Sequence, residues 1–191
     1  MSIARNIAEF EQRLSGTGCR LVAVTKTKPV EMLREAYAAG CKRFGENRVQ
    51  EMADKQPQLP ADVEWHLIGH LQTNKVKYIA PFVALIHSVD SLKLLQEIDK
   101  QAAKNQRVID CLLQIFIARE ETKFGLDYAE AEALLASGEV ERLRNVRVVG
   151  LMGMATFTEN REQVKQEFRR LKQFFEKLKA SPLPANVSMQ E

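Results

Sequence analysis

Hydrophobic runs alternate with helix-like segments along the whole chain. Short runs rich in β-branched and other apolar residues predict seven strands, at residues 20–26, 42–46, 63–69, 83–89, 108–118, 146–155 and 185–190. The segments between them carry apolar residues at helical spacing, and the longest of these covers residues 160–179. Regular alternation of strands and helices favours a parallel β-sheet.

Three of the predicted strands are apolar nearly throughout, at residues 21–24, 110–118 and 146–154. Strands of this kind are covered on both faces, as in a doubly wound sheet or in the core of a barrel. No G-x-G-x-x-G turn follows the first strand, and the strand–helix units repeat regularly. The pattern therefore favours a TIM-type (β/α)8 barrel over a dinucleotide-binding fold.

The length of the chain limits how much of a barrel it can form. At 191 residues and 45% hydrophobic content it can fill one core, and no linker-like segment divides it, so a single domain over residues 1–191 is predicted. A complete eight-stranded barrel normally takes about 250 residues and at least about 200. We therefore expect the barrel to be incomplete at its C-terminus, without the eighth strand.

Composition argues against several other classes of protein. The 28 basic and 25 acidic residues are interleaved rather than gathered into a stripe, so no nucleic-acid-binding surface is expected. Cys19, Cys41 and Cys111 are widely spaced and odd in number, which suggests neither a disulfide framework nor a cysteine zinc site. No apolar run approaches the length that spans a membrane, and a cytoplasmic protein is expected.

Lys26 is the first candidate for chemistry. It ends an apolar strand in which alternation places Val22, Val24 and Lys26 on one side, toward the mouth of a barrel. The carboxyl ends of barrel strands are where catalytic residues lie, although a lysine at a strand end is also a common solvated cap. Lys28 follows, held extended by Pro29, so that both amines project to the same side.

Six motifs, in this order and spacing, resemble those of the pyridoxal 5′-phosphate (PLP) homeostasis proteins of the YggS/PROSC type. They are AVTKTKP (23–29), FGENRVQE (44–51), WHLIGHLQTNK (65–75), IHSVDSLKLL (86–95), ETKFG (121–125) and GLMGMA (150–155). The resemblance covers nearly the whole chain. It implies a barrel of the alanine racemase N-terminal domain type, with PLP held as an internal aldimine on Lys26.

The same resemblance implies three further cofactor-binding residues. Asn47 is expected to hold the ring oxygen of PLP or a water beside the imine, Lys123 to face the phenolic oxygen, and Met154 to stack its thioether on the pyridine ring. Each has an alternative interpretation that stays open: Asn47 ends a strand and begins a helix, Lys123 is an ordinary loop lysine, and Met154 packs in the core.

His66 and His70 form an H-x-x-x-H pattern that suggests a metal site. On a strand rising about 3.3 Å per residue, however, their Cα atoms lie roughly 13 Å apart, too far to share one ion. We therefore predict no metal site, and assign His66, with Trp65 and Gly69, to the wall and rim of the barrel. His87 and Ser88 close the next strand, and nothing in the sequence assigns them a role.

The predicted function is that of a PLP-binding protein in vitamin B6 and amino-acid homeostasis. Its partners are expected to be PLP and PLP-dependent apoenzymes, and the resemblance implies a monomer. A racemase is not expected, because the related racemases take a second base from a separate domain. The alternatives are a Schiff-base lyase or aldolase that uses Lys26 directly on a carbonyl substrate, and an adaptor that presents the helix at residues 160–179.

The resemblance is incomplete after the seventh predicted strand. Family members continue with a serine-rich loop and an R-[IV]-G-[ST] segment, whose amides and hydroxyls are expected to hold the PLP phosphate. Loops after the seventh and eighth strands form the usual phosphate site of such barrels. A chain that truly ended at Glu191 is therefore expected to bind PLP weakly and to aggregate through its unpaired strand edges.

Overall fold

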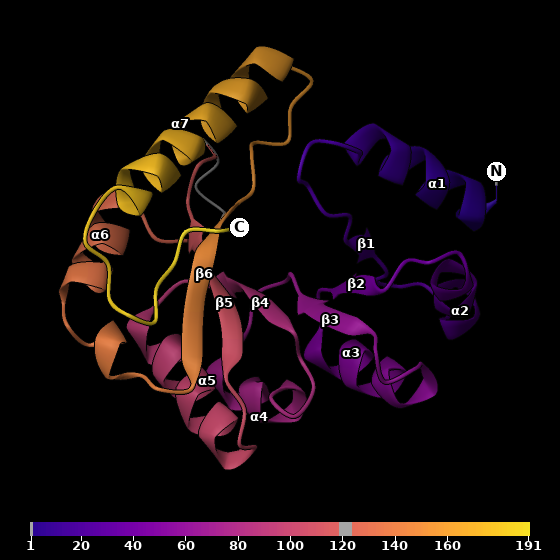
Figure 1. The fold of residues 1–191 in the computed structure, drawn as a ribbon, viewed down its shortest axis with the longest axis horizontal. Coiled ribbons are helices and arrows are strands. Elements are labelled where there is room, and N and C mark those ends of the chain that lie inside the picture. Colours follow the sequence, from indigo (N-terminus) through magenta and orange to yellow (C-terminus); the bar gives the residue numbers. More distant parts are fainter. Residues whose placement is uncertain (1, 119–123) are drawn as a thin grey trace.

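A computed structural model describes residues 2–118 and 124–191 of the chain. Its centre is a curved sheet of parallel strands, each hydrogen-bonded to the next along the sequence (Figure 1). The strands are β1 (Ala23–Val24), β2 (Arg43–Glu46), β3 (Glu64–Leu67), β4 (Leu85–Val89), β5 (Ile109–Ile115) and β6 (Val146–Gly153). The predicted parallel sheet is confirmed.

One helix, α1, precedes β1, and a helix follows each strand in the predicted alternation (Figure 1). The helices are α1 (Ile3–Leu14), α2 (Val30–Ala38), α3 (Val49–Lys55), α4 (Val76–Ile79), α5 (Leu92–Lys104), α6 (Tyr128–Ala136) and α7 (Arg161–Lys179), with short 3-10 turns at Gln56–Gln58, Thr73–Lys75 and Val140–Arg142. None of the helices that the structure describes has both the length and the apolar character needed to cross a bilayer.

Polar side chains fix where several helices begin. Ser91 caps α5 by accepting a hydrogen bond from the backbone N–H of Leu94, and Asn160 caps α7 in the same way. At α6, Asp127 accepts from the N–H of Glu130 while the Glu130 carboxylate accepts from the N–H of Asp127. These reciprocal bonds satisfy donors that a helix start otherwise leaves without partners.

The two faces of the sheet are buried very differently. The main core lies between the strands and the helices, where Phe44, Trp65 and Leu67 are almost fully buried together with side chains of every major helix. The opposite, concave face carries a separate and much smaller cluster of Leu85, Leu112 and Val149. Because successive side chains of a strand point to opposite faces, both clusters come from the same strands.

The two ends of the sheet depart from the predicted strand boundaries. The first strand is only Ala23–Val24 rather than residues 20–26, since residues 20–22 are not part of it. On its C-terminal side the backbone turns at Lys26 and Thr27, where Thr27 adopts a φ of 63°. Residues 185–190 lie parallel to β6, with Ser188 N donating to Val148 O at 2.8 Å, but they form a single bridge rather than a regular strand. Within the described residues β1 pairs with β2 alone, so the sheet is open.

Candidate functional site

Three of the four predicted cofactor-binding residues lie at the carboxyl edge of the sheet. Asn47 and Met154 directly follow β2 and β6, and Lys26 lies two residues beyond β1. Lys26 and Met154 are exposed, and Asn47 is half-buried. No hydrogen bond or ion pair in the described parts of the chain joins the three side chains. Lys123 lies outside the described residues.

The turn that carries Lys26 is held by its neighbours. Thr25 is buried, and its hydroxyl donates a hydrogen bond to Glu46 Oε1 at 2.7 Å. On the other side of Lys26, the backbone N–H of Thr27 donates to Glu51 Oε1 at 2.5 Å. Val24 and Lys26 are exposed while Thr25 between them is buried, as strand alternation predicts. The amine of Lys26 therefore projects from a fixed turn into an accessible space.

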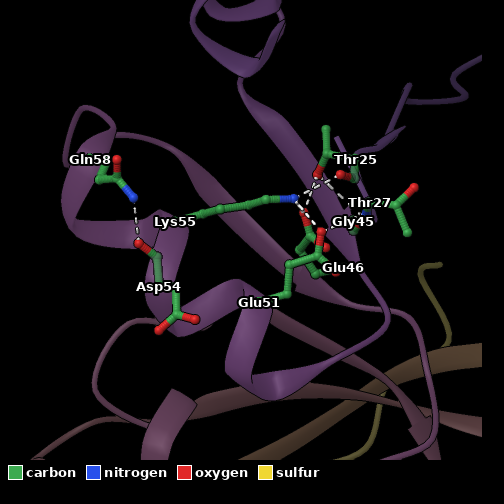
Figure 2. Close-up of polar contacts among 8 residues, drawn as sticks. All are labelled: Thr25, Thr27, Gly45, Glu46, Glu51, Asp54, Lys55 and Gln58. Atoms are coloured by element: carbon green, nitrogen blue, oxygen red, sulfur yellow. Dashed lines mark hydrogen bonds and ion pairs between the residues drawn. The ribbon is translucent and has the colours of Figure 1, made fainter. Parts of the chain in front are cut away.

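A buried lysine joins these contacts into one network, shown in Figure 2. Lys55 Nζ donates to Thr25 O at 2.9 Å, to Glu46 Oε1 at 2.8 Å and to Glu51 Oε1 at 2.6 Å. The side chain of Lys55 is 8% exposed and that of Glu46 is fully buried. Burial alone would raise the pKa of Glu51, but the hydrogen bonds from Lys55 and Thr27 bring that pKa below its ordinary value.

Two histidines on adjacent strands form a second polar group, in which His66 is buried and His87 is half-buried. His66 Nδ1 and His87 Nε2 are 2.9 Å apart, so one ring donates a hydrogen bond to the other. Burial lowers the pKa of both to about 4, helped at His66 by nearby arginines and at His87 by His66. Both rings are therefore neutral at pH 7. His66 alternates along β3 with the core residues Trp65 and Leu67, which places it on the concave face.

His70, the other half of the H-x-x-x-H pattern, has different neighbours. Its ring stacks on Phe124, with centroids 4.6 Å apart, and its Nδ1 lies 3.7 Å from a carboxylate oxygen of Asp90. His66 and His70 thus make separate contacts. Across the residues that the structure describes, no three His, Cys, Asp or Glu side chains are grouped so that they could hold a metal ion.

The backbone around Asn47 is tightly packed against the end of β3. A Cβ atom on Gly69 would lie 2.4 Å from the carbonyl oxygen of Asn47, so only glycine fits there. Beside it, Asn47, Arg48, His70 and Lys75 line a cavity of about 280 Å³. A hollow with two basic side chains, Arg48 and Lys75, in its lining therefore adjoins the carboxyl edge at a predicted site residue.

Sequence reasoning missed the polar residues beneath the Lys26 turn. The i, i+4 spacing of Glu51 and Lys55 was a visible signal for an ion pair on one helix. Nothing local indicated that this pair would reach Thr25 or the carboxylate of Glu46 on β2. The partnership of His66 with His87 was likewise missed, because it depends on how β3 and β4 align.

The sequence matches known proteins over nearly its whole length. The family model described as the alanine racemase N-terminal domain matches residues 1–190. A pyridoxal phosphate homeostasis protein of Aquifex aeolicus is 44% identical over 165 residues, which cover 85% of this chain and 72% of that protein. The chain belongs to the family of pyridoxal phosphate homeostasis proteins, whose fold is that of the alanine racemase N-terminal domain. The resemblance read from its six motifs is thereby confirmed.

Solved structures agree with this family assignment. PipY of Synechococcus elongatus PCC7942 is 33% identical to this chain. Its structure without PLP superposes with a TM-score of 0.91, and the match covers all of this chain and 87% of the PipY chain. A second PipY structure, with PLP bound, matches with a TM-score of 0.87. Histidine racemase of Leuconostoc mesenteroides matches at 14% identity and a TM-score of 0.74, which shows a shared fold. The predicted barrel type is confirmed.

Proposed function

We propose that this chain binds PLP covalently through Lys26 and serves in intracellular PLP and amino-acid homeostasis. The observation that carries the proposal is the exposed side chain of Lys26, on a turn whose neighbouring residues Thr25 and Thr27 are hydrogen-bonded, at the carboxyl edge of the sheet. That edge is where barrels of this kind bind their ligands. PipY, which matches this chain along its full length, has been solved with PLP bound.

The chemistry requires one amine and an accessible aldehyde. The neutral Nζ of Lys26 attacks the aldehyde carbon of PLP, a C–N bond forms, and the aldehyde oxygen leaves as water. Lys26 makes no hydrogen bond or ion pair through its side chain within the described residues, so no partner must be displaced first. The bond to Lys26 is reversible, because attack by a second amine at the same carbon would release the Lys26 amine.

The other site residues have supporting roles in the proposal. Asn47 holds the ring oxygen or a water beside the imine, and Met154 places its thioether against the ring. Lys123 faces the phenolic oxygen. The half-buried position of Asn47 and the 43% exposure of Met154 leave both side chains accessible to a ligand at this edge.

A carrier role is preferred over catalysis. The curated relatives are named homeostasis proteins, whereas the racemases that share the fold match at low identity and over about half of their own length. We propose a single cytoplasmic domain over residues 1–191 that acts as a monomer, holds PLP reversibly and passes it to apoenzymes. It needs no acid or base beyond the lysine.

The test is the visible absorption spectrum of the purified chain mixed with PLP, before and after borohydride. An imine band is expected in the wild type, is trapped by reduction, and is lost in Lys26→Ala. Lys28→Ala is the matched control, since it removes the neighbouring exposed amine and is expected to keep the band. Mass spectrometry of the reduced protein should place PLP on the peptide that contains Lys26.

Two results would contradict the proposal. One is a wild-type chain without an imine band, and the other is a band that persists in Lys26→Ala. Turnover of a carbonyl substrate in the absence of PLP would instead favour the lyase or aldolase alternative, which uses the same amine.

A further inference from the structure

The turn at Lys26 is closed by a hydrogen bond from the Lys28 N–H to Thr25 O at 3.0 Å, and charged residues of other elements hold it as well. Three groups that flank Lys26 are each held from outside the turn: the Thr25 carbonyl by Lys55, the Thr25 hydroxyl by Glu46, and the Thr27 N–H by Glu51. Figure 2 shows these bonds converging between the end of β1, the end of β2 and α3. The backbone on both sides of Lys26 is thus anchored.

Thr27 has a backbone conformation that its own side chain disfavours, so contacts from outside the turn are needed to hold it. Its φ of 63° lies in the left-handed region, which a β-branched residue rarely adopts. Such a conformation persists only where surrounding contacts enforce it. The bond from the Thr27 N–H to Glu51 is one such contact, and Glu51 is itself held by Lys55 at 2.6 Å.

The composition of the network argues for a positioning role rather than a purely stabilising one. It places two carboxylates and one ammonium group in a mostly buried setting, and Glu46 Oε2 has no hydrogen-bond partner in the described structure. Apolar residues of similar volume stabilise a fold as well as a buried ion pair does, or better. Charge-assisted hydrogen bonds, by contrast, are directional, so they can fix the orientation of the backbone groups on either side of Lys26.

We propose that Glu51 and Lys55 are positioning residues for Lys26, setting the place of its amine for the capture of PLP. This inference rests on the proposed function. Neither residue touches the cofactor in this scheme. Loss of Glu51 frees the Thr27 N–H, lets the turn relax from its left-handed conformation, and moves the Lys26 amine away from the direction of attack.

The experiment compares Glu51→Ala with Asp54→Ala, a matched control on the same helix. Asp54 accepts a hydrogen bond from Gln50 at 2.8 Å and lies away from the Lys26 turn in Figure 2. Each variant loses one carboxylate and one local interaction of α3. PLP affinity and the rate of imine formation are measured by the imine band, and folding is measured by circular dichroism and thermal midpoint.

We expect Glu51→Ala to weaken PLP binding about tenfold and to slow imine formation by a similar factor, because a misplaced nucleophile reacts more slowly. Asp54→Ala should stay within about twofold of the wild type, as surface substitutions usually do. Glu51→Gln keeps an acceptor oxygen for the Thr27 N–H, and is expected to recover most of the rate. A merely structural role of Glu51 would lower the thermal midpoint without changing the rate of imine formation.

The outcomes separate this inference from the proposed function. If the wild type forms the imine and Glu51→Ala forms it as fast and as tightly as Asp54→Ala, the positioning role is refuted while PLP binding stands. If the wild type forms no imine, the proposed function fails and the inference fails with it. If Glu51→Ala does not fold, Glu51→Met decides, since it keeps the volume of the side chain without an acceptor for the Thr27 N–H. Slowed imine formation in Glu51→Met supports the positioning role, and a rate equal to that of Asp54→Ala overturns it.

Discussion

The two faces of the sheet differ in what they bury, although the same strands build both. The helix-facing side carries Trp65, Leu67 and Ile86 within one continuous core. The concave side carries the small cluster around Leu112 and, next to it, polar groups such as His66. Most of the buried apolar surface thus lies between the sheet and its helices. The concave face and its carboxyl edge can therefore carry polar side chains.

The comparison is tested most strongly by matched leucine substitutions on the two faces. Leu67 and Leu112 are both buried strand residues, at 0% and 5% exposure. Leu67→Ala is expected to lower the free energy of unfolding by about 4 kcal/mol, because helices and strands enclose the cavity that it leaves. Leu112→Ala is expected to cost about 2 kcal/mol, since its open surroundings can collapse or admit water. Urea denaturation measures both, and equal losses would contradict the distinction.

The second test uses the polar pair of the concave face. Burial lowers the pKa of His66 and His87 to about 4, so between pH 6.5 and 4 the unfolded chain binds more protons than the folded protein. The free energy of unfolding is therefore not reduced by these rings above pH 6.5, and it falls as the pH drops from 6.5 toward 4. From pH 7.5 to 5.5 we expect a loss of about 1.4 kcal/mol from each ring, or about 3 kcal/mol in total.

The measurement for this second test is the free energy of unfolding from urea titrations at several pH values. The control is the double variant His66→Asn/His87→Asn, whose stability should depend less steeply on pH. Equal slopes in the two proteins would show that the histidine pair is not the source of the pH dependence.

The smallest effect on stability is expected at the exposed rim. Met154 is 43% exposed just beyond β6, so Met154→Ala should change the free energy of unfolding by less than about 0.5 kcal/mol. The same substitution is expected to weaken PLP binding, because the proposed ring contact is lost. A large loss of stability with unchanged PLP affinity would instead support the interpretation of Met154 as a core residue.

Local patterns predicted more of the fold than of the site. The alternation of strands and helices was correct, and the start of the helix at residues 160–179 agrees with its asparagine cap. Lys26 lies in the turn two residues beyond β1 rather than in the strand, although it is exposed like Val24 while Thr25 between them is buried, as the predicted alternation requires. Both boundaries of the first strand were wrong. At its C-terminal end the chain turns at Thr27, whose N–H donates to Glu51, 24 residues away.

The sequence by itself determined the parallel α/β architecture and the family, since these follow from short-range periodicity and ordered motifs. Only the tertiary structure decided what holds the backbone on either side of Lys26. Lys55 reaches Thr25 across 30 positions of the chain, and Thr25 reaches Glu46 across 21. Such contacts arise when strands align and a helix folds back over them, and no pattern within a single segment specifies them.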